Sequence, residues 1–111
     1  SVHSNGFSQE SANGYSVYTS RGNTKSDQYA EILLKYMQLE FPDRKMRKDT
    51  SDSDRDKEAD FYVLSKTKMP AILSENFFMT NKEECKLLLQ KSFRDRIANC
   101  HFELIKQIEN G

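Results

Sequence analysis

The sequence is poor in several residue types and has no net charge, and these absences narrow the kind of protein it can be. Its 111 residues include no Trp, 2 Cys, 2 Pro and 4 Gly, and 17 basic residues are balanced by 17 acidic ones. A chain without net charge produces no broad positive field that would attract nucleic acid or an anionic membrane. No apolar run approaches the roughly 20 residues of a transmembrane helix. We therefore expect no nucleic-acid partner and no membrane span.

Motifs of several large enzyme classes are also missing. The sequence has no Cys-x-x-Cys pair, no Gly-rich phosphate loop and no Gly-x-Ser-x-Gly nucleophile elbow. Its cysteines, Cys85 and Cys100, both fall in a C-terminal region of helical spacing. On one helix they would lie roughly 22 Å apart, whereas a disulfide requires Cα atoms within about 7 Å of each other. We predict two free thiols.

The residues that are present predict one domain, or a large piece of one, spanning residues 1–111. Hydrophobic residues make up 36% of the chain and charged residues 31%, enough for a modest core under a solvated surface. Residues 15–19 (YSVYT) alternate strong β formers and predict a strand. A helix follows, capped by Ser26 or Asp27 and ended by Pro42. Its apolar face consists of five residues at helical spacing, namely Ala30, Leu33, Leu34, Met37 and Phe41.

The middle of the chain predicts a charged loop followed by short apolar segments. Residues 43–60 mix both charge signs and predict a solvated loop. The alternative is a loop beside a substrate cleft, in which Arg47 or Arg55 touches an anionic group. Residues 61–64 predict a short strand or a one-turn helix, and residues 71–75 (AILSE) predict a central strand.

The last third of the chain predicts helix. Thr80 or Asn81 can cap it, with Glu83 or Glu84 at the third helical position as a capping box. Helical spacing then continues almost to the end of the chain, with a break near residues 90–92. This order of strands and helices predicts an α/β fold in which helices pack on a sheet.

Two polar residues at predicted strand ends are the candidates for chemistry. Glu75 ends the strand predicted at residues 71–75, and a buried carboxylate without a partner is costly. In open α/β sheets, ligands bind at the C-terminal ends of strands. His3 lies in a similar position after Val2. The alternative is that Glu75 points to solvent or pairs with a lysine and that His3 is an ordinary surface residue. His101, inside the last helix, is expected to be structural.

Taken in order, several segments resemble the zinc-dependent N-acetylmuramoyl-L-alanine amidases of the amidase 3 type, enzymes that cleave peptidoglycan. Ser1 to Asn5 (SVHSN) looks like the family's Ser-Ile-His-Ala-Asn segment, and Gly14 to Ser20 (GYSVYTS) is similar to its Gly-rich turn and following strand. Ser26 to Leu34 resembles the helix that comes next. Phe61 to Asn81 resembles VL…PAVLVE.GF.SN and is the most specific match, and Ile97-Ala98 fits the family's closing helix.

The resemblance implies a fold, a cofactor and a role for individual residues. It implies an α/β domain with a mixed sheet flanked by helices in three layers. Zinc would be the cofactor, with His3 as its third protein ligand. Glu75 would be the catalytic carboxylate that activates the zinc-bound water. Asn5 and Arg55 are candidates for supporting the ligands or for contacting the substrate, which the resemblance implies is peptidoglycan.

Two departures from the family pattern lie beside the predicted catalytic acid. Ser74 replaces the usual apolar residue before it, and Asn76 precedes Phe77, where the family commonly has Gly. In the family, a His and a Glu from segments before the Ser-Val-His strand supply the first two zinc ligands. We therefore expect this chain to be the C-terminal part of a catalytic domain, inactive by itself and able to self-associate through an exposed sheet edge.

The resemblance also implies a location, and two other classes of function stay open. The location would be the bacterial cell envelope or its exterior, or a lysing host cell if a phage encodes the protein. One alternative is a zinc-free protein of the amidase fold that only binds wall fragments or a regulator. The other is an unrelated α/β interaction module, in which His3 and Glu75 would lie more than about 10 Å apart, farther than a zinc-centred site allows.

Overall fold

A mixed sheet with helices packed against it forms the fold. The computed structural model describes residues 1–20, 24–47, 57–58 and 62–111. The elements run in the order β1 (Val2–Asn5), β2 (Tyr15–Thr19), α1 (Lys25–Glu40), β3 (Lys57–Glu58), α2 (Tyr62–Ser65), β4 (Leu73–Phe78), α3 (Lys82–Leu88) and α4 (Lys91–Asn110).

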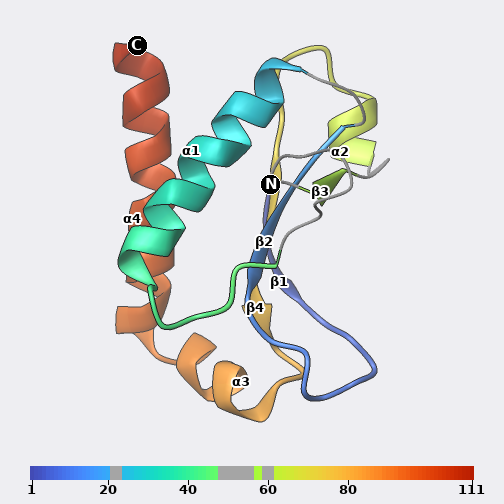
Figure 1. Ribbon diagram of the computed structural model, residues 1–111, viewed down its shortest axis with the longest axis vertical. Helices are drawn as coiled ribbons and strands as arrows, with labels where there is room; N and C mark the ends of the chain where they lie inside the picture. The colour runs from blue at the N-terminus through green and yellow to red at the C-terminus, as the bar shows by residue number, and fades with distance from the viewer. Residues whose placement is uncertain (21–23, 48–56, 59–61) are drawn as a thin grey trace.

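The strands are ordered β1-β4-β2-β3 across the sheet. β1 runs parallel to β4, β2 runs antiparallel to β4, and β3 runs parallel to β2. The helices α1 and α4 pack against each other along one side of the sheet, and α3 joins β4 to α4 at one end of the molecule (Figure 1). The α/β class and the mixed sheet expected from the sequence are therefore confirmed.

The first helix and the strand before it form where the sequence predicts them, with a different cap. β2 covers residues 15–19 as expected. The N-cap of α1 is Thr24, two residues before Ser26 and three before Asp27, the predicted caps. The Asp27 carboxylate accepts a hydrogen bond from the Thr24 N–H at 2.8 Å. Asp27 thus stands at the third helical position. The helix ends at Glu40, before Pro42, and its five predicted apolar residues are all buried.

The second half of the chain differs from the prediction in two places, β3 and the limits of β4. Residues 62–65 form the one-turn helix α2, one of the two structures predicted for this segment. Within the charged segment, residues 57–58 form the short strand β3, which the charge pattern gave no reason to expect. β4 covers residues 73–78, not 71–75, because Asn76 pairs with β2 and Phe78 with β1. Glu75 therefore lies inside its strand. The predicted break in the last helix is confirmed between α3 and α4.

A cluster of aromatic rings forms the centre of the core. The Phe77 ring is fully buried, 5.2 Å from the Phe41 ring, 5.0 Å from Phe93 and 5.9 Å from Tyr15 between centroids. The Phe77 backbone has a φ of 67°, a left-handed conformation that costs a non-glycine residue about 1–2 kcal/mol. The register of β1 on β4 shifts at this point, because two residues of β1 face three of β4. Burial of the ring offsets this backbone strain.

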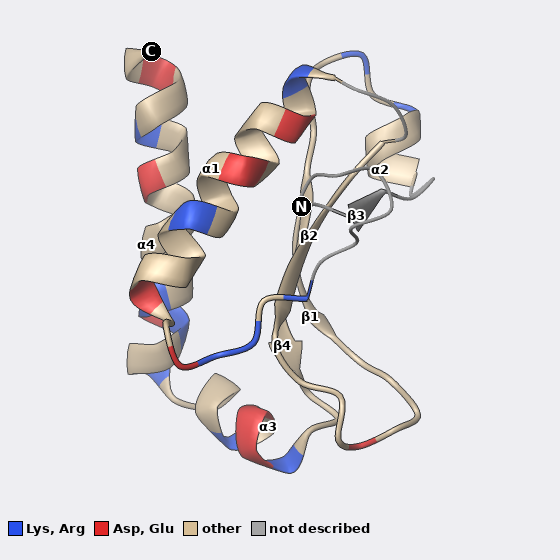
Figure 2. Cartoon of the chain, viewed as in Figure 1, with Lys and Arg blue, Asp and Glu red and all other residues tan. Residues whose placement is uncertain are grey.

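Charges of both signs are distributed along the helices. Lysine, arginine and acidic residues are interspersed on α1, α3 and α4, so that no helix presents a single sign (Figure 2). Among the helices in the described part of the chain, none combines the length and the apolar character needed to cross a membrane.

Candidate functional site

His3 and Glu75 are directly opposite each other on neighbouring parallel strands. The register of β1 on β4 pairs His3 with Glu75, and the register of β2 on β4 pairs Glu75 with Ser16. Because residues paired across strands project from the same face of a sheet, the three side chains form one row. The sequence predicted that His3 and Glu75 would each lie at the end of a strand. Both instead lie inside their strands, but the two residues still come together.

The Glu75 carboxylate is only partly accessible, and one of its oxygens has no partner. Oε2 is buried and accepts no hydrogen bond from any residue that the structure describes. Burial raises the pKa of Glu75, and the charge of His3 opposes that rise. A buried carboxylate oxygen without a partner is rare in folded proteins and calls for an explanation, such as a water or a ligand.

The side chains around this pair come from the sheet itself. Ser16, on β2, is 1% exposed and lies beside Glu75 of β4. Tyr18, two residues along β2, has a pKa raised by burial, and the Glu75 charge raises it further. The exposed His3 ring lies 2.8 Å from the Ser1 hydroxyl through Nε2. The site therefore has a solvent-facing imidazole at its outer end and buried polar groups at its inner end.

The other predicted site residues do not join this row. Asn5, at the end of β1, accepts a hydrogen bond from Gly6 N through its side chain at 2.8 Å. Arg47 donates to Asn13 O at 3.2 Å and lies over the Phe78 ring at 5.0 Å from its centroid. Arg55 lies outside the described residues.

The donor set fits part of a zinc centre but not all of one. Catalytic zinc sites have three protein ligands and an open position for water. No three His, Cys, Asp or Glu side chains gather as a possible metal site within the part of the chain that the structure describes. His3 supplies one imidazole next to the unpartnered Glu75 oxygen. Both cysteines are free, as predicted, and lie on α3 and α4.

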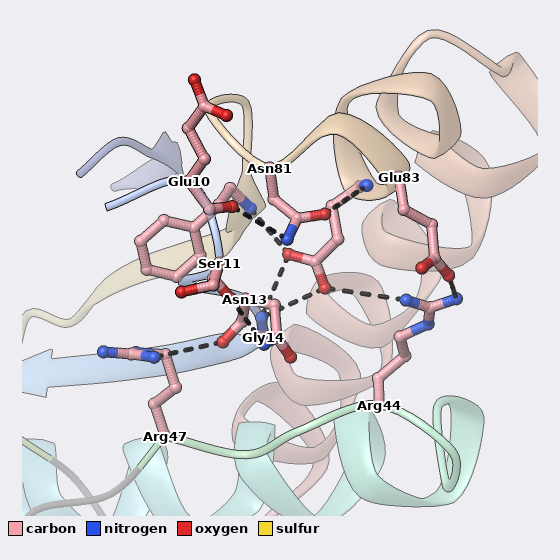
Figure 3. A network of polar contacts seen from close by, with 10 residues as sticks. Glu10, Ser11, Asn13, Gly14, Arg44, Arg47, Asn81 and Glu83 are labelled. Carbon is pink, nitrogen blue, oxygen red and sulfur yellow. Dashed lines mark hydrogen bonds and ion pairs between the residues drawn. The ribbon is translucent and has the colours of Figure 1, made fainter. Parts of the chain in front are cut away.

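The buried carboxylate of Glu84 holds together the loops next to the site. The sequence predicted only a helix-capping role for this residue. Glu84 is 0% exposed, and its carboxylate accepts hydrogen bonds from Gly14 N at 3.0 and 3.1 Å and from Phe78 N at 3.0 Å. The Arg44 guanidinium lies 3.8 Å from it. Gly14, Arg44 and their neighbours converge at this point from three separate segments (Figure 3). Asn81 caps α3 as predicted, through a bond from Glu84 N at 3.0 Å.

Glycine is required at the loop end of this network. Gly14 has a φ of +106°, and a Cβ atom there would lie 2.3 Å from the Lys45 carbonyl oxygen. No sequence signal reveals the bond between Glu84 and Gly14, because the two residues are 70 positions apart. The Glu84 carboxylate therefore joins the end of β4 to the start of β2, the two strands that carry Glu75 and Ser16.

Comparison with protein-family models shows which family the chain belongs to. The family model described as Amidase_3, N-acetylmuramoyl-L-alanine amidase, matches residues 1–107. The chain belongs to this amidase family. The resemblance inferred from the sequence is thereby confirmed.

Relatives of the amidase chain include a phage enzyme and several solved bacterial enzymes. An endolysin of Bacillus phage SPP1 is 47% identical over 55 residues, which are 50% of this chain and 20% of the endolysin. An N-acetylmuramoyl-L-alanine amidase from Clostridium difficile 630 superposes with a TM-score of 0.83 at 21% identity, over 99% of this chain and 56% of that one. AmiC2 of Nostoc punctiforme superposes with a TM-score of 0.81 at 24% identity, over 99% and 56%. The chain thus spans about half of these amidase structures, and its 55 matched residues span a fifth of the endolysin.

Proposed function

We propose that this chain contributes His3 and Glu75 to the zinc-dependent centre of a peptidoglycan amidase. The bond hydrolysed is the amide between the lactyl carbonyl of N-acetylmuramic acid and the amine of L-alanine. The observation that carries the proposal is the pairing of His3 with Glu75 on adjacent strands, with one buried carboxylate oxygen left without a partner. Membership of the amidase family supports the reaction class.

In the proposed mechanism, Glu75 acts as the general base. Zinc in such a centre lowers the pKa of a bound water to about 7 and polarises the carbonyl that is attacked. Glu75 takes up a proton at Oε2 and later returns it to the leaving amine. Burial raises the pKa of Glu75, and this shift favours a carboxyl group that can hold the proton between the two steps.

His3 would hold the metal as one of three protein ligands. Because its ring is exposed and its side-chain partner among the described residues is the Ser1 hydroxyl, little has to move for the ring to reach an ion. The other two ligands, a His and a Glu, would come from outside the residues of this chain. We therefore expect the 111-residue chain alone to bind zinc weakly and to release no muropeptides.

The roles of the two residues can be separated in the complete catalytic domain that contains this sequence. Glu75→Gln keeps the size of the side chain but cannot accept a proton, so turnover should fall by about 10²–10⁴ while zinc content is unchanged. His3→Ala leaves the metal with two protein ligands, so zinc itself should be lost. Metal content and muropeptide release are measured side by side on both variants.

Matched controls show whether the losses are specific to the site. Ser4→Ala changes the exposed neighbour of His3, and Glu83→Gln changes an exposed acid on α3. Both should keep zinc and full turnover. Full activity in Glu75→Gln, or tightly held zinc in His3→Ala, would show that the assigned roles are wrong.

A second candidate function is binding without catalysis. It is the zinc-free alternative left open by the sequence, and the described residues, which hold no three-ligand metal cluster, are compatible with both functions. In that case the protein retains muropeptides or wall fragments, takes up no zinc at any concentration tested, and loses nothing on Glu75→Gln. The same metal assay distinguishes this outcome from the amidase.

A further inference from the structure

A continuous chain of hydrogen bonds links α4 to the backbone of His3. On α4, His101 Nδ1 lies 2.8 Å from Ile97 O, and its Nε2 lies 2.8 Å from Ser74 Oγ on β4. Asn76 Nδ2 donates to Ser74 Oγ at 2.9 Å and to His3 O at 3.1 Å. We refer to His101, Ser74 and Asn76 as the relay. It joins three elements and ends on the residue opposite Glu75.

The chemistry of the partners fixes the direction of each bond. Ile97 O can only accept, so His101 Nδ1 carries the proton, and in a neutral imidazole Nε2 is then an acceptor. Ser74 Oγ–H donates to that nitrogen, and the Ser74 oxygen accepts from the Asn76 amide. The second Asn76 N–H goes to His3 O. Burial lowers the pKa of His101, which favours the neutral ring that this arrangement needs.

The relay lies on the face of the sheet opposite the side chains of His3 and Glu75. Ser74 and Asn76 flank Glu75 in sequence and are 2% and 3% exposed, respectively. Their side chains alternate with that of Glu75 and point toward the helices, as the contact with α4 requires. Two buried polar side chains are tolerated because each has a partner.

We propose that His101, Ser74 and Asn76 are positioning residues that hold β1 in register on β4, so that His3 stays opposite Glu75. The inference rests on the proposed function, which makes this pair part of the reaction centre. β1 needs such support because it is four residues long, lies at the edge of the described sheet, and is mostly exposed. The relay connects the core to the backbone of His3 by hydrogen bonds and so restrains the position of His3.

The first test measures the register directly in this chain. The amides of Ser74 and Met79 donate to Ser1 O and Asn5 O and report on the contact between β1 and β4. Asn76→Leu removes the bond to His3 while keeping the size of the side chain. Hydrogen exchange at these two amides should accelerate about tenfold, the effect of losing one typical hydrogen bond. Amides between β2 and β4 should be unchanged. Ser74→Ala, a smaller change, replaces Asn76→Leu if that variant does not fold.

The second test uses the complete catalytic domain and a conservative rescue. With zinc supplied in excess, His101→Leu should lower kcat about 10–100-fold with KM unchanged, and zinc affinity should fall because His3 is less firmly placed. His101→Gln should restore most of the rate, because its Oε1 can accept from Ser74 in place of Nε2. Phe102→Leu, on the exposed side of α4, is the matched control and should have no effect.

The outcomes separate this inference from the proposed function. If Glu75→Gln abolishes turnover but the relay variants change neither exchange nor kcat, the relay is overturned and the proposed function stands. If exchange accelerates without a change in kcat, or if His101→Gln rescues nothing, the role is structural only and positioning is overturned. If Glu75→Gln keeps full turnover, the proposed function fails, and the exchange data alone decide whether the relay holds β1.

Discussion

The Glu75 carboxylate is partly shielded from water. The residues on either side of it in β4, Ser74 and Asn76, are buried. A structural carboxylate in such a place would be stabilised by hydrogen bonds to both oxygens, as Glu84 is. Glu75 Oε2 instead lacks a partner among the described residues. The folded chain therefore tolerates an unfavourable group at this position, as reaction centres commonly do.

This cost predicts a pH-dependent gain in stability when the charge is removed. Burial raises the pKa of Glu75 in the folded chain above its value in the unfolded chain. The folded state thus binds a proton more tightly, and it loses stability relative to Glu75→Gln as the pH rises through the folded pKa. Glu75→Gln should be the more stable protein at pH 7, and the two should converge below the usual glutamate pKa of about 4.3.

Urea unfolding of both proteins between pH 4 and pH 8 checks this expectation. Glu109→Gln, which removes an exposed carboxylate near the end of α4, is the control and should show no such trend. A Glu75→Gln protein that is less stable than the unmodified chain at neutral pH would contradict the prediction.

At the residue scale, the sequence predicted the pair but not its surroundings. His3 and Glu75 stand out because an imidazole and an acid each lie at a predicted strand end, and the family resemblance named both. The partners of Glu84 and His101 could not be predicted, because Gly14 and Ser74 reach them only through the fold, 70 and 27 residues away. A capping-box pattern already accounts for an acid at position 84. The sequence therefore gives no further reason to expect that Glu84 binds the distant Gly14.

At the scale of elements, the Glu84 carboxylate is the contact that joins β2, β4 and α3. It satisfies the N–H groups of Gly14 and Phe78 at one point, and Arg44 adds a cation from the segment after α1. Burial raises the pKa of Glu84, and these partners oppose the rise. The carboxylate therefore stabilises the junction mainly as a hydrogen-bond acceptor for backbone groups that have no strand partner there.

Removing this acceptor should destabilise the chain far more than removing its neighbour. Glu84→Ala leaves two buried backbone N–H groups unsatisfied, each at a cost of about 1–3 kcal/mol in the free energy of unfolding. Glu84→Gln keeps one acceptor oxygen and should lose less. Glu83→Ala breaks an ion pair with Arg44 whose acid is 72% exposed, and should cost at most about 1 kcal/mol. Urea midpoints of the three variants provide the comparison, and equal losses at positions 83 and 84 would disprove the role given to Glu84.

The accuracy with which elements were predicted depends on how local their cause is. β2 and α1 follow from alternation and helical spacing within a single segment, and they lie where the sequence placed them. The limits of β4 depend on its partners, since Phe78 is held by β1 and Glu84, and the prediction ended that strand three residues early. β3 has only charged residues, Lys57 and Glu58, and forms because β2 offers an edge.

At the scale of the whole molecule, the sheet ends in an exposed strand. β1 is the edge strand next to β4, and Val2 is 63% exposed. The solved amidases that this chain matches are about twice its length. In a complete catalytic domain, we expect the additional residues to cover this edge. In the 111-residue chain alone, the unpaired backbone groups and the apolar side chain of β1 are available to a second copy.

We therefore predict that the isolated chain self-associates through β1. Sedimentation velocity over a range of protein concentrations should show a monomer in equilibrium with a larger species. Val2→Lys places a charge on the edge strand, the device by which natural sheets prevent such pairing, and should shift the equilibrium toward monomer by tenfold or more, about 1.4 kcal/mol. Leu39→Lys, at a residue 70% exposed on α1, changes hydrophobicity and charge equally but away from the edge and should leave association unchanged. A chain that stays monomeric at every concentration, or that responds equally to both substitutions, would show that β1 is not the contact.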